Sequence, residues 1–461
     1  MRKLIPLLIL VCFTRFLKAQ FPNTLTSSEK IYGLSKFWQE VNYNFIFLDK
    51  VGKKKWDSIY KQFIPVVMNT QNDYDYFREL QKFCALLKDG HTNVYLPETK
   101  EYETMTTMFG DYRLFIKDIN GKAIVVRTNL SKKTEIPVGS EITEVNGLTT
   151  KDYMSKNVSP YIASSTDYVL EDWSTNRLLT GFKGNEYDLK IKRPKGDIIS
   201  LKLTHAQTAE KEVFPPFEDN QSLLDFKWLP EQVAYIALNG FGDPKIDSLF
   251  IAKLPELYKA KGLIIDLRYN GGGSTNVGAE IFQYLTNDKL MYGSRSVTRN
   301  HIATYKAWGA YTTAKDTAED KTGWSKKCLL SFNDTYYHNF DYAPDSIKIT
   351  GKRIVVPTAL LIGHNTASAA EDFLIFADNQ KHMVKIGEKT FGSTGQPYSF
   401  DLVGGATARV CTKKDTYPDG REFIGFGIKP DIEVKQTVED YLLKRDPVLE
   451  KAREYLKAKI K

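Results

Sequence analysis

A serine at the predicted start of a helix is the first residue of this chain that could carry chemistry. Ser368 stands in the run Thr-Ala-Ser-Ala-Ala-Glu-Asp-Phe, after an apolar strand-like segment and a turn. Such a serine can act as a nucleophile, because the next backbone N–H, that of Ala369, and the positive end of the helix dipole can stabilise an oxyanion. The same position also suits a serine that only caps the helix.

A glycine-rich turn could supply a second set of backbone donors. Residues 262–273 read Gly-Leu-Ile-Ile-Asp-Leu-Arg-Tyr-Asn-Gly-Gly-Gly, which is typical of a strand covered on both faces followed by a sharp turn. Glycines permit positive φ angles and a close approach of the backbone to a ligand. The N–H groups of Gly271 and Gly272 are therefore candidates for an oxyanion hole shared with Ala369. A tight turn that binds no ligand is the alternative.

Four motifs together carry a family resemblance. Besides these two segments, the chain contains Ile-Gly-Glu-Lys-Thr-Phe-Gly at 386–392 and Gly-Ile-Lys-Pro-Asp at 427–431. In their order and spacing the motifs resemble those of the tail-specific, or carboxyl-terminal processing, serine peptidases, in a bacterial-type secreted form. Relatives of that family include the tricorn core protease and the retinoid-binding repeats of the photoreceptor matrix. The resemblance covers residues from about 30 to 435 and implies that Ser368 is the nucleophile.

The chain departs from this family at the catalytic base. The processing peptidases use a lysine 25 positions after the serine, and Ser393 occupies that position here. A Ser/Lys dyad is therefore not expected, yet some group must take the hydroxyl proton, because a free serine is a weak nucleophile at neutral pH. The nearest lysines, Lys385 and Lys389, are interpreted as surface charges.

A histidine far upstream is the candidate base. His91 follows the run Leu-Leu-Lys-Asp-Gly at 86–90, and tricorn-type relatives are similar in having a histidine just after a helix of an N-terminal helical domain. The sequence predicts this helix from Asp73 as N-cap to a C-terminal signal at Gly90. One apolar stripe at helical spacing supports it: Phe77, Leu80, Cys84 and Leu87. A histidine that merely caps the preceding carbonyls is the alternative.

The group that would orient this histidine stays open. Tricorn-type members carry a glutamate shortly before the motif at 427–431, and that position falls on Ile424 here. Other polar residues lie near the motif, near the histidine or at the missing lysine's position. The candidates for an orienting or accessory role are Asp419, Glu422, Asp89 and Ser393.

A second module is expected between the helical start and the catalytic half. Residues 136–147 resemble the central turn and strand of a PDZ domain, and the strand-like runs 123–127 and 187–192 fit a small β-barrel from about 110 to 204. PDZ domains bind a peptide C-terminus along a sheet edge. The polar stretch 155–180 would then cover part of the groove. A spacer without peptide affinity is the alternative.

Length and composition favour several domains. A chain of 461 residues with 42% hydrophobic content exceeds what one core usually organises. We predict an α/β multidomain fold, and the resemblance implies a crotonase-like ββα catalytic core. The long polar connection 294–345, with several aromatic residues, is interpreted as a lid or substrate wall. The expected parts are a signal peptide at 1–19, an N-terminal helical domain at 20–105, a PDZ-like domain at 106–206 and an α/β serine peptidase domain at 207–461.

The first residues have the pattern of a secretory signal. Arg2 and Lys3 precede an apolar run at 4–13, and Leu-Lys-Ala at 17–19 precedes Gln20. The run is too short to span a membrane, and no later run reaches 18 apolar residues. An exported protein, periplasmic or extracellular, is expected. Removal of 1–19 takes away four basic residues and no acidic one, so the net charge falls from +8 to +4, which argues against a nucleic-acid partner.

The predicted chemistry needs no cofactor. After residue 19 the cysteines are three and widely spaced, which suits neither a disulfide framework nor a zinc site. Acyl transfer requires only a nucleophile, a base and oxyanion donors. We therefore predict a serine-type endopeptidase or carboxyl-terminal processing peptidase that acts on polypeptides, with Ser368 as nucleophile and His91 as base. A binding protein that retains the fold without catalysis, like the retinoid-binding relatives, is the alternative.

Overall fold

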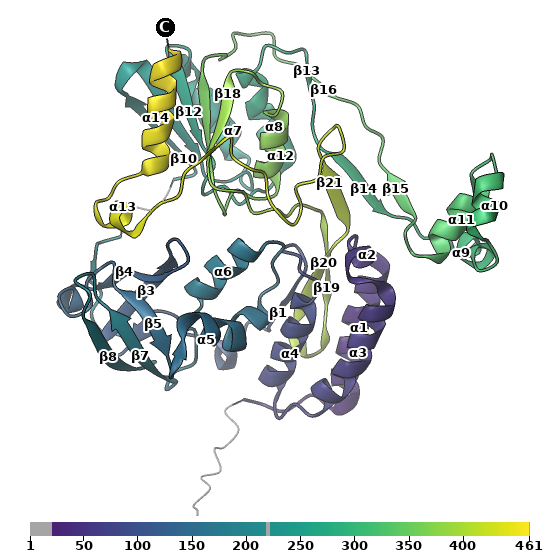
Figure 1. Cartoon of the computed structure of the whole chain (residues 1–461), viewed down its shortest axis with the longest axis horizontal. Helices are drawn as coiled ribbons and strands as arrows, with labels where there is room; N and C mark the ends of the chain where they lie inside the picture. The colour runs from purple at the N-terminus through teal and green to yellow at the C-terminus, as the bar shows by residue number, and fades with distance from the viewer. Residues whose placement is uncertain (1–20, 218–221, 461) are drawn as a thin grey trace, which may run out of the picture.

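The computed structural model describes residues 21–217 and 222–460. The signal peptide predicted at 1–19 lies outside the described residues. Figure 1 shows the N-terminal helices beside strands from the C-terminal half, a second sheet next to them, and a larger sheet covered by the C-terminal helix. None of the helices in the described ranges has the length and apolar character that crossing a membrane requires.

Four helices open the described chain, and their apolar residues recur every three to four positions. In α1 this spacing buries Leu34, Phe37 and Val41. The predicted stripe of the fourth helix is also buried, which confirms that helix. The four helices are α1 (Ser27–Asn44), α2 (Leu48–Val51), α3 (Lys53–Met68) and α4 (Asp73–Ala85).

Both predicted ends of α4 need correction. The N-cap is Asn72, whose side chain accepts from the Asp75 N–H, whereas Asp73 is helical and its buried carboxylate accepts from the N–H of Thr24. The helix ends at Ala85, before Gly90. Gly90 is explained by packing, since a Cβ there would lie 2.6 Å from Cε1 of the Phe391 ring.

A second sheet forms the region predicted as the inserted module. Its strands follow the order β2-β3-β4-β5-β7-β8, with β6 beside β5 and β9 beside β4, and the pairs are antiparallel. Alternating burial along β7 places one face of the sheet on a core. The strands predicted at 123–127 and 187–192 are confirmed. The elements are β2 (Met108–Phe109), β3 (Tyr112–Asp118), β4 (Ala123–Asn129), β5 (Glu141–Val145), β6 (Leu148–Thr149), α5 (Thr150–Asn157), α6 (Asp167–Asn176), β7 (Glu186–Lys192), β8 (Ile198–Thr204) and β9 (Val213–Phe214).

A six-stranded sheet of order β10-β11-β12-β17-β18-β22 organises the C-terminal half, and its pairs are parallel except β10 with β11. Strands β12 and β17 are buried at every residue, which explains their continuous apolar sequences. The strands are β10 (Leu224–Leu229), β11 (Val233–Leu238), β12 (Gly262–Asp266), β17 (Thr358–Ile362), β18 (Met383–Gly387) and β22 (Ile432–Glu433).

Helices cover both faces of this sheet. Ile264 and Leu361 pack with residues of the C-terminal helix α14, whereas their neighbours Ile265 and Leu360 share a core with helices of the opposite face (Figure 1). The period-2 alternation of a strand explains this division. The helices are α7 (Lys245–Leu257), α8 (Thr275–Phe282), α12 (Ala369–Phe376), α13 (Val438–Leu442) and α14 (Pro447–Lys459).

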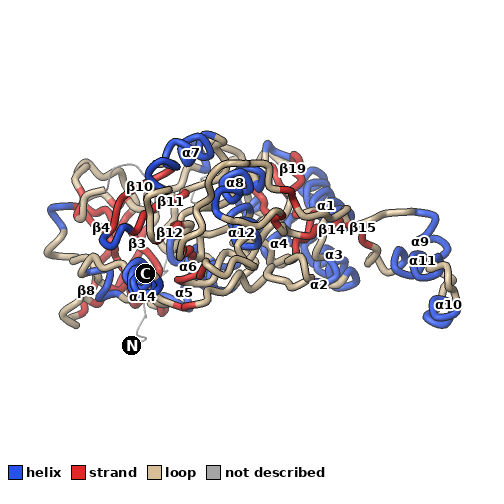
Figure 2. Tube along the Cα trace, turned by 90° about the horizontal axis from the view of Figure 1, so that it is seen from above, coloured by secondary structure: helices blue, strands red, loops and turns tan. Residues whose placement is uncertain are grey.

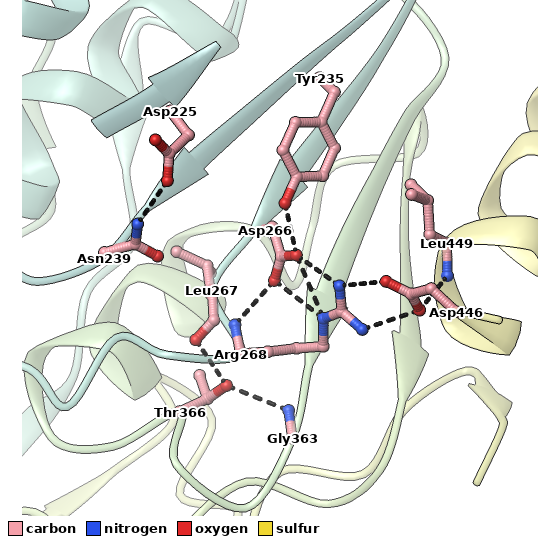
Figure 3. A network of polar contacts seen from close by, with 10 residues as sticks. All are labelled: Asp225, Tyr235, Asn239, Asp266, Leu267, Arg268, Gly363, Thr366, Asp446 and Leu449. Carbon is pink, nitrogen blue, oxygen red and sulfur yellow. Dashed lines mark hydrogen bonds and ion pairs between the residues drawn. The ribbon is translucent and has the colours of Figure 1, made fainter. Parts of the chain in front are cut away.

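Figure 3 shows how α14 is fastened to the sheet. The guanidinium of Arg268 lies between Asp266 at the end of β12 and Asp446, which caps α14 by accepting from the Leu449 N–H. The Tyr235 hydroxyl donates to Asp266 as well. Separating α14 from the sheet would break the bonds of Arg268 with Asp446 and leave charges without a partner. We therefore interpret this network as a rigid link between α14 and β12.

Smaller sheets join the N-terminal helices to the C-terminal half. Strand β1 pairs with β20, and β14 pairs with both β21 and β15. Beyond β14 and β15 the chain forms an arm of three short helices that projects from the body (Figures 1 and 2). The remaining elements are β1 (Asn93–Tyr95), β13 (Leu290–Met291), β14 (Arg295–Arg299), α9 (Ala303–Gly309), α10 (Ala314–Glu319), α11 (Trp324–Phe332), β15 (Tyr337–Asn339), β16 (Asp345–Ser346), β19 (Pro397–Asp401), β20 (Thr407–Cys411) and β21 (Lys413–Thr416).

Candidate active site

Ser368 sits at the turn between β17 and α12, where the sequence places it. Its φ of 55° and ψ of −121° are unusual for a residue with a side chain. The turn is held by Thr366, whose hydroxyl donates to the carbonyl of Leu267 at 2.9 Å and accepts from the Gly363 N–H at 3.1 Å (Figure 3). A strained residue held by its surroundings is a frequent feature of catalytic sites.

The glycine turn packs directly against this serine. Gly272 has a φ of 94°, and a Cβ there would lie 2.7 Å from both the carbonyl oxygen of Ala367 and the Cβ of Ser368. The Gly272 N–H donates to Oδ1 of Asn270 at 3.0 Å, so it is already engaged. No described residue accepts from the N–H of Ala369 or of Gly271. Of the three predicted oxyanion donors, these two are the ones with a free N–H.

A buried glutamate that the sequence analysis did not single out is hydrogen-bonded to the backbone of Ser368. Glu371 accepts from the N–H groups of Ser368 at 3.1 Å, Gly392 at 2.8 Å and Ser393 at 3.3 Å. The Thr390 hydroxyl donates to it at 2.5 Å. Burial raises the pKa of Glu371 to about 8, while these four donors favour the carboxylate. Glu371 thus joins the Ser368 turn to the 390–393 loop.

His91 lies on the other side of that loop. Its Nδ1 is 2.7 Å from the hydroxyl oxygen of Ser393, and this hydroxyl is 3.4 Å from Oδ1 of Asp89. Asp89 is buried, and its Oδ2 accepts from the Thr92 hydroxyl at 2.7 Å. Burial lowers the pKa of His91, and the charge of Asp89 acts in the opposite direction. Two of the four candidate accessory residues therefore meet at His91.

The other two accessory candidates have partners elsewhere. Asp419 pairs with Arg421 at 2.7 Å, and Glu422 pairs with Lys414. The interpretation of Lys385 as a surface charge is corrected by the structure. Its side chain is only 14% exposed, and its Nζ lies 3.5 Å from Oδ1 of Asp431. The partners of Asp419 and Glu422 lie two and eight positions away in the sequence, whereas Lys385 and Asp431 are 46 positions apart.

Comparisons with known proteins identify relatives of this chain. The family described as Peptidase family S41 matches residues 232–434. The chain is 23% identical over 419 residues to a carboxyl-terminal-processing protease of Picosynechococcus sp., which covers 89% of this chain and 84% of the relative. It is 23% identical over 344 residues to the carboxy-terminal processing protease CtpA of Bacillus subtilis, which covers 74% of this chain but only 58% of that relative. Residues 232–434 belong to peptidase family S41.

The solved structure of mature CPAF has the same fold. Its TM-score is 0.63 at 15% identity, over 94% of this chain and 96% of that one. The mixed α/β fold of the S41 proteases is thereby established, and the prediction that the chain is a peptidase is confirmed by the family match. The roles of single residues in this S41 site remain predictions.

The region predicted as the inserted module contacts three loops of the candidate site. Ser165 accepts from the Gly90 N–H at 2.9 Å, and the Tyr168 hydroxyl donates to the Thr390 carbonyl at 2.6 Å. Asp172 on α6 lies 2.6 Å from Nδ1 of His364, in the turn before the serine. Residues of the stretch predicted to cover the groove of that module therefore pack on the loops of the candidate site.

The pair between His364 and Asp172 predicts a pH-dependent stability. Burial lowers the pKa of His364, but the bond to Asp172 raises it overall above its ordinary value of 6.5. Because the folded-state pKa is raised, the stabilisation is present below pH 6.5 and is lost as the pH rises through the folded-state pKa. Asp172→Asn should therefore lower the unfolding midpoint by roughly 1–3 °C at pH 5.5 and by less at pH 9.

Calorimetry on the full chain would test this, with Asp167→Asn, an exposed change on the same helix, as control. A loss for Asp172→Asn that is equal at both pH values would contradict the assignment.

Proposed function

We propose that this protein is a serine-type peptidase that hydrolyses polypeptides through an acyl-enzyme on Ser368, with His91 as general base. The observation that supports it most is the continuous path through the site. The Ser368 turn, with the free Ala369 N–H beside it, is joined through Glu371 to the loop whose Ser393 contacts His91. These bonds join three segments that are distant in sequence. Among the described residues His91 bonds to Ser393, and the proposal requires its Nε2 to reach the Ser368 hydroxyl.

The proposed reaction proceeds in two halves. The Ser368 oxygen attacks the carbonyl carbon of the peptide bond while its proton passes to Nε2 of His91, and the N–H groups of Ala369 and Gly271 stabilise the oxyanion. His91 then gives the proton to the leaving amine as the C–N bond breaks. Water, deprotonated by His91, attacks the ester, and the acid product leaves with the Ser368 hydroxyl restored.

Ser393 acts in this proposal as a positioning residue in place of the missing lysine. The Nδ1–H of His91 donates to the Ser393 hydroxyl, which in turn donates to Asp89. This arrangement leaves Nε2 unprotonated, which is the state that a general base needs. In this proposal Asp89, two residues before His91, takes the place of the glutamate that the resemblance expects near position 424, and it acts through the Ser393 hydroxyl.

The pH dependence of hydrolysis tests this assignment. Burial lowers the pKa of His91, so kcat/KM for a quenched fluorescent peptide should rise with pH through one group whose pKa is below 6.5. A lysine base would instead produce an inflection at higher pH. Lys413 is the only such group beside His91 among the described residues, and although burial lowers its pKa, the ion pair with Asp415 raises it overall. An inflection above pH 7 would count against His91.

The finer architecture supports a processing role. We propose that 106–206 is a PDZ-like module that receives the C-terminus of the polypeptide, that 20–105 is a helical domain, and that 207–461 holds a crotonase-like peptidase core. The antiparallel sheet with α5 and α6, and the PDZ-like motif within it, support the module. The names of the two curated relatives support carboxyl-terminal processing. The leader-like sequence at 1–19 supports an exported protein.

A further inference from the structure

A cavity of about 370 Å³ lies at the base of the projecting arm. It is formed where the end of α1 and the start of α3 meet the end of β14 and the residues after α11. This volume is within the range of pockets that hold small ligands. The charged residues of its lining are Lys53, Arg299, Lys306 and Asp334.

Positive charge exceeds negative charge in this cavity. Nζ of Lys53 and Nζ of Lys306 lie 2.6 and 2.7 Å from the two carboxylate oxygens of Asp334. The guanidinium of Arg299, nearly inaccessible, lies 4.0 Å from the same carboxylate. Asp334 is the one carboxylate beside these three cations among the described lining residues, and Arg299 also donates to the carbonyls of Asn42 and Asp334 and has Asp49 nearby. Asp57, the next carboxylate near Lys53, is already bonded to the indole N–H of Trp38.

Unpartnered polar atoms accompany this charge. The hydroxyl of Ser331, 4% exposed, and Oδ1 of Asn42 are buried and have no hydrogen-bond partner among the described residues. The hydroxyl can donate to an anion, whereas the amide oxygen needs a donor such as a peptide N–H. Tyr43 and His301, whose rings stack at 4.2 Å, provide a flat aromatic wall. Contacts to an anion, to an N–H group and to the face of a ring together match an acidic peptide better than a bare ion.

The cavity is also connected to the proposed active site. Ser294, just before β14, donates to Asp372 on the helix that begins after Ser368. Arg299 lies at the other end of β14, five residues on. At about 3.3 Å per residue the two ends are roughly 17 Å apart. A polypeptide that runs alongside β14 in an extended conformation would cover this span with about five residues.

We propose that this cavity is an exosite that binds an acidic side chain or carboxylate of the polypeptide substrate. The inference rests on the proposed peptidase function, but its binding step does not require catalysis. A free small anion would have the same charge chemistry, so the experiment separates the two sources.

Calorimetric titrations should use the full-chain Ser368→Ala variant, which binds without turnover. The probes are an N-acetylated, C-amidated pentapeptide with two central glutamates, the same peptide with glutamines, citrate and phosphate. We expect the glutamate peptide to bind at least tenfold more tightly than the glutamine peptide and than either free anion. Equal binding of the two peptides would overturn the proposal, and so would citrate or phosphate binding as tightly as the acidic peptide.

Two substitutions should change the affinity in opposite directions. Lys306→Gln should weaken binding of the glutamate peptide at least fivefold, whereas Asp334→Asn, which removes the competing carboxylate, should strengthen it. Lys315→Gln, on an exposed residue of the same arm, is the matched control and should have no effect. If Lys306→Gln and Asp334→Asn both weaken binding, the cluster only anchors the arm and the proposal is wrong. If the wild-type protein hydrolyses no peptide, the peptidase proposal is refuted, and the binding results remain valid.

Discussion

Ser368→Ala is expected to reduce peptide hydrolysis by on the order of 10⁶, to the level left by binding and the oxyanion donors alone. The hydroxyl is the group that forms the acyl-enzyme, and neither Ser393 nor Thr366 can replace it, because both are bonded within the site. Alanine adopts the same backbone conformation at no greater cost than serine, so the fold should be retained. Turnover of a fluorogenic peptide and the unfolding midpoint, measured together, check both parts.

Ser393→Ala is the matched serine control for this result. It removes a hydroxyl from the same site but leaves Ser368 and His91 in place, so activity should fall by much less. A Ser368→Ala protein that stays folded and keeps more than a few per cent of wild-type turnover would refute the nucleophile. If Ser368→Ala and Ser393→Ala lose the same amount of turnover, Ser393 is as important as Ser368, which contradicts the proposed roles.

His91→Ala is expected to lower turnover by about 10² to 10⁴, the usual contribution of a positioned general base. The acid limb of the pH profile should disappear with it, because the group that titrates has been removed. Lys389→Ala is the control, since Lys389 lies against the ring of Tyr168 and should contribute little. Near-normal turnover of His91→Ala together with an inactive Lys389→Ala would place the chain with the Ser/Lys enzymes.

Asp89→Asn distinguishes orientation from a structural role. The charge of Asp89 raises the pKa of His91 against the larger effect of burial. Removing that charge should therefore move the acid limb to lower pH while kcat falls. A variant that loses activity without any shift of the limb would indicate that Asp89 only holds the loop through its bond with Thr92.

Local patterns were sufficient for the elements that carry the site. The apolar runs of β12 and β17 predict buried strands, and the small residues after β17 predict the helix start at Ser368, because these signals depend on neighbouring residues. The stripe of α4 likewise predicts its buried face. The prediction that Gly90 ends the helix is wrong because this position depends on a distant residue. A small residue is required there by the ring of Phe391, which is 301 positions away.

Contacts between distant segments could not be predicted from the sequence. Glu371 has the sequence position of an ordinary acidic residue in the first turn of a helix, and only the fold shows that four donors surround it. The choice of Asp89 over Glu422 at His91 depends on how the 390–393 loop crosses the end of the helical region. The sequence predicts that the connection 294–345 forms a lid or a substrate wall, and it contains no signal for the direction in which the arm within this connection projects.

The most direct test of the central claim is to map the adduct of a fluorophosphonate probe on the full chain by peptide mass analysis. Such probes react with a serine whose proton is taken by a neighbouring base and whose oxyanion finds donors. The proposed site predicts a single adduct on Ser368 in the wild type and a strongly slowed reaction in His91→Ala. An adduct on another serine, or no adduct on a folded protein, would contradict it and favour a binding protein with a peptidase fold.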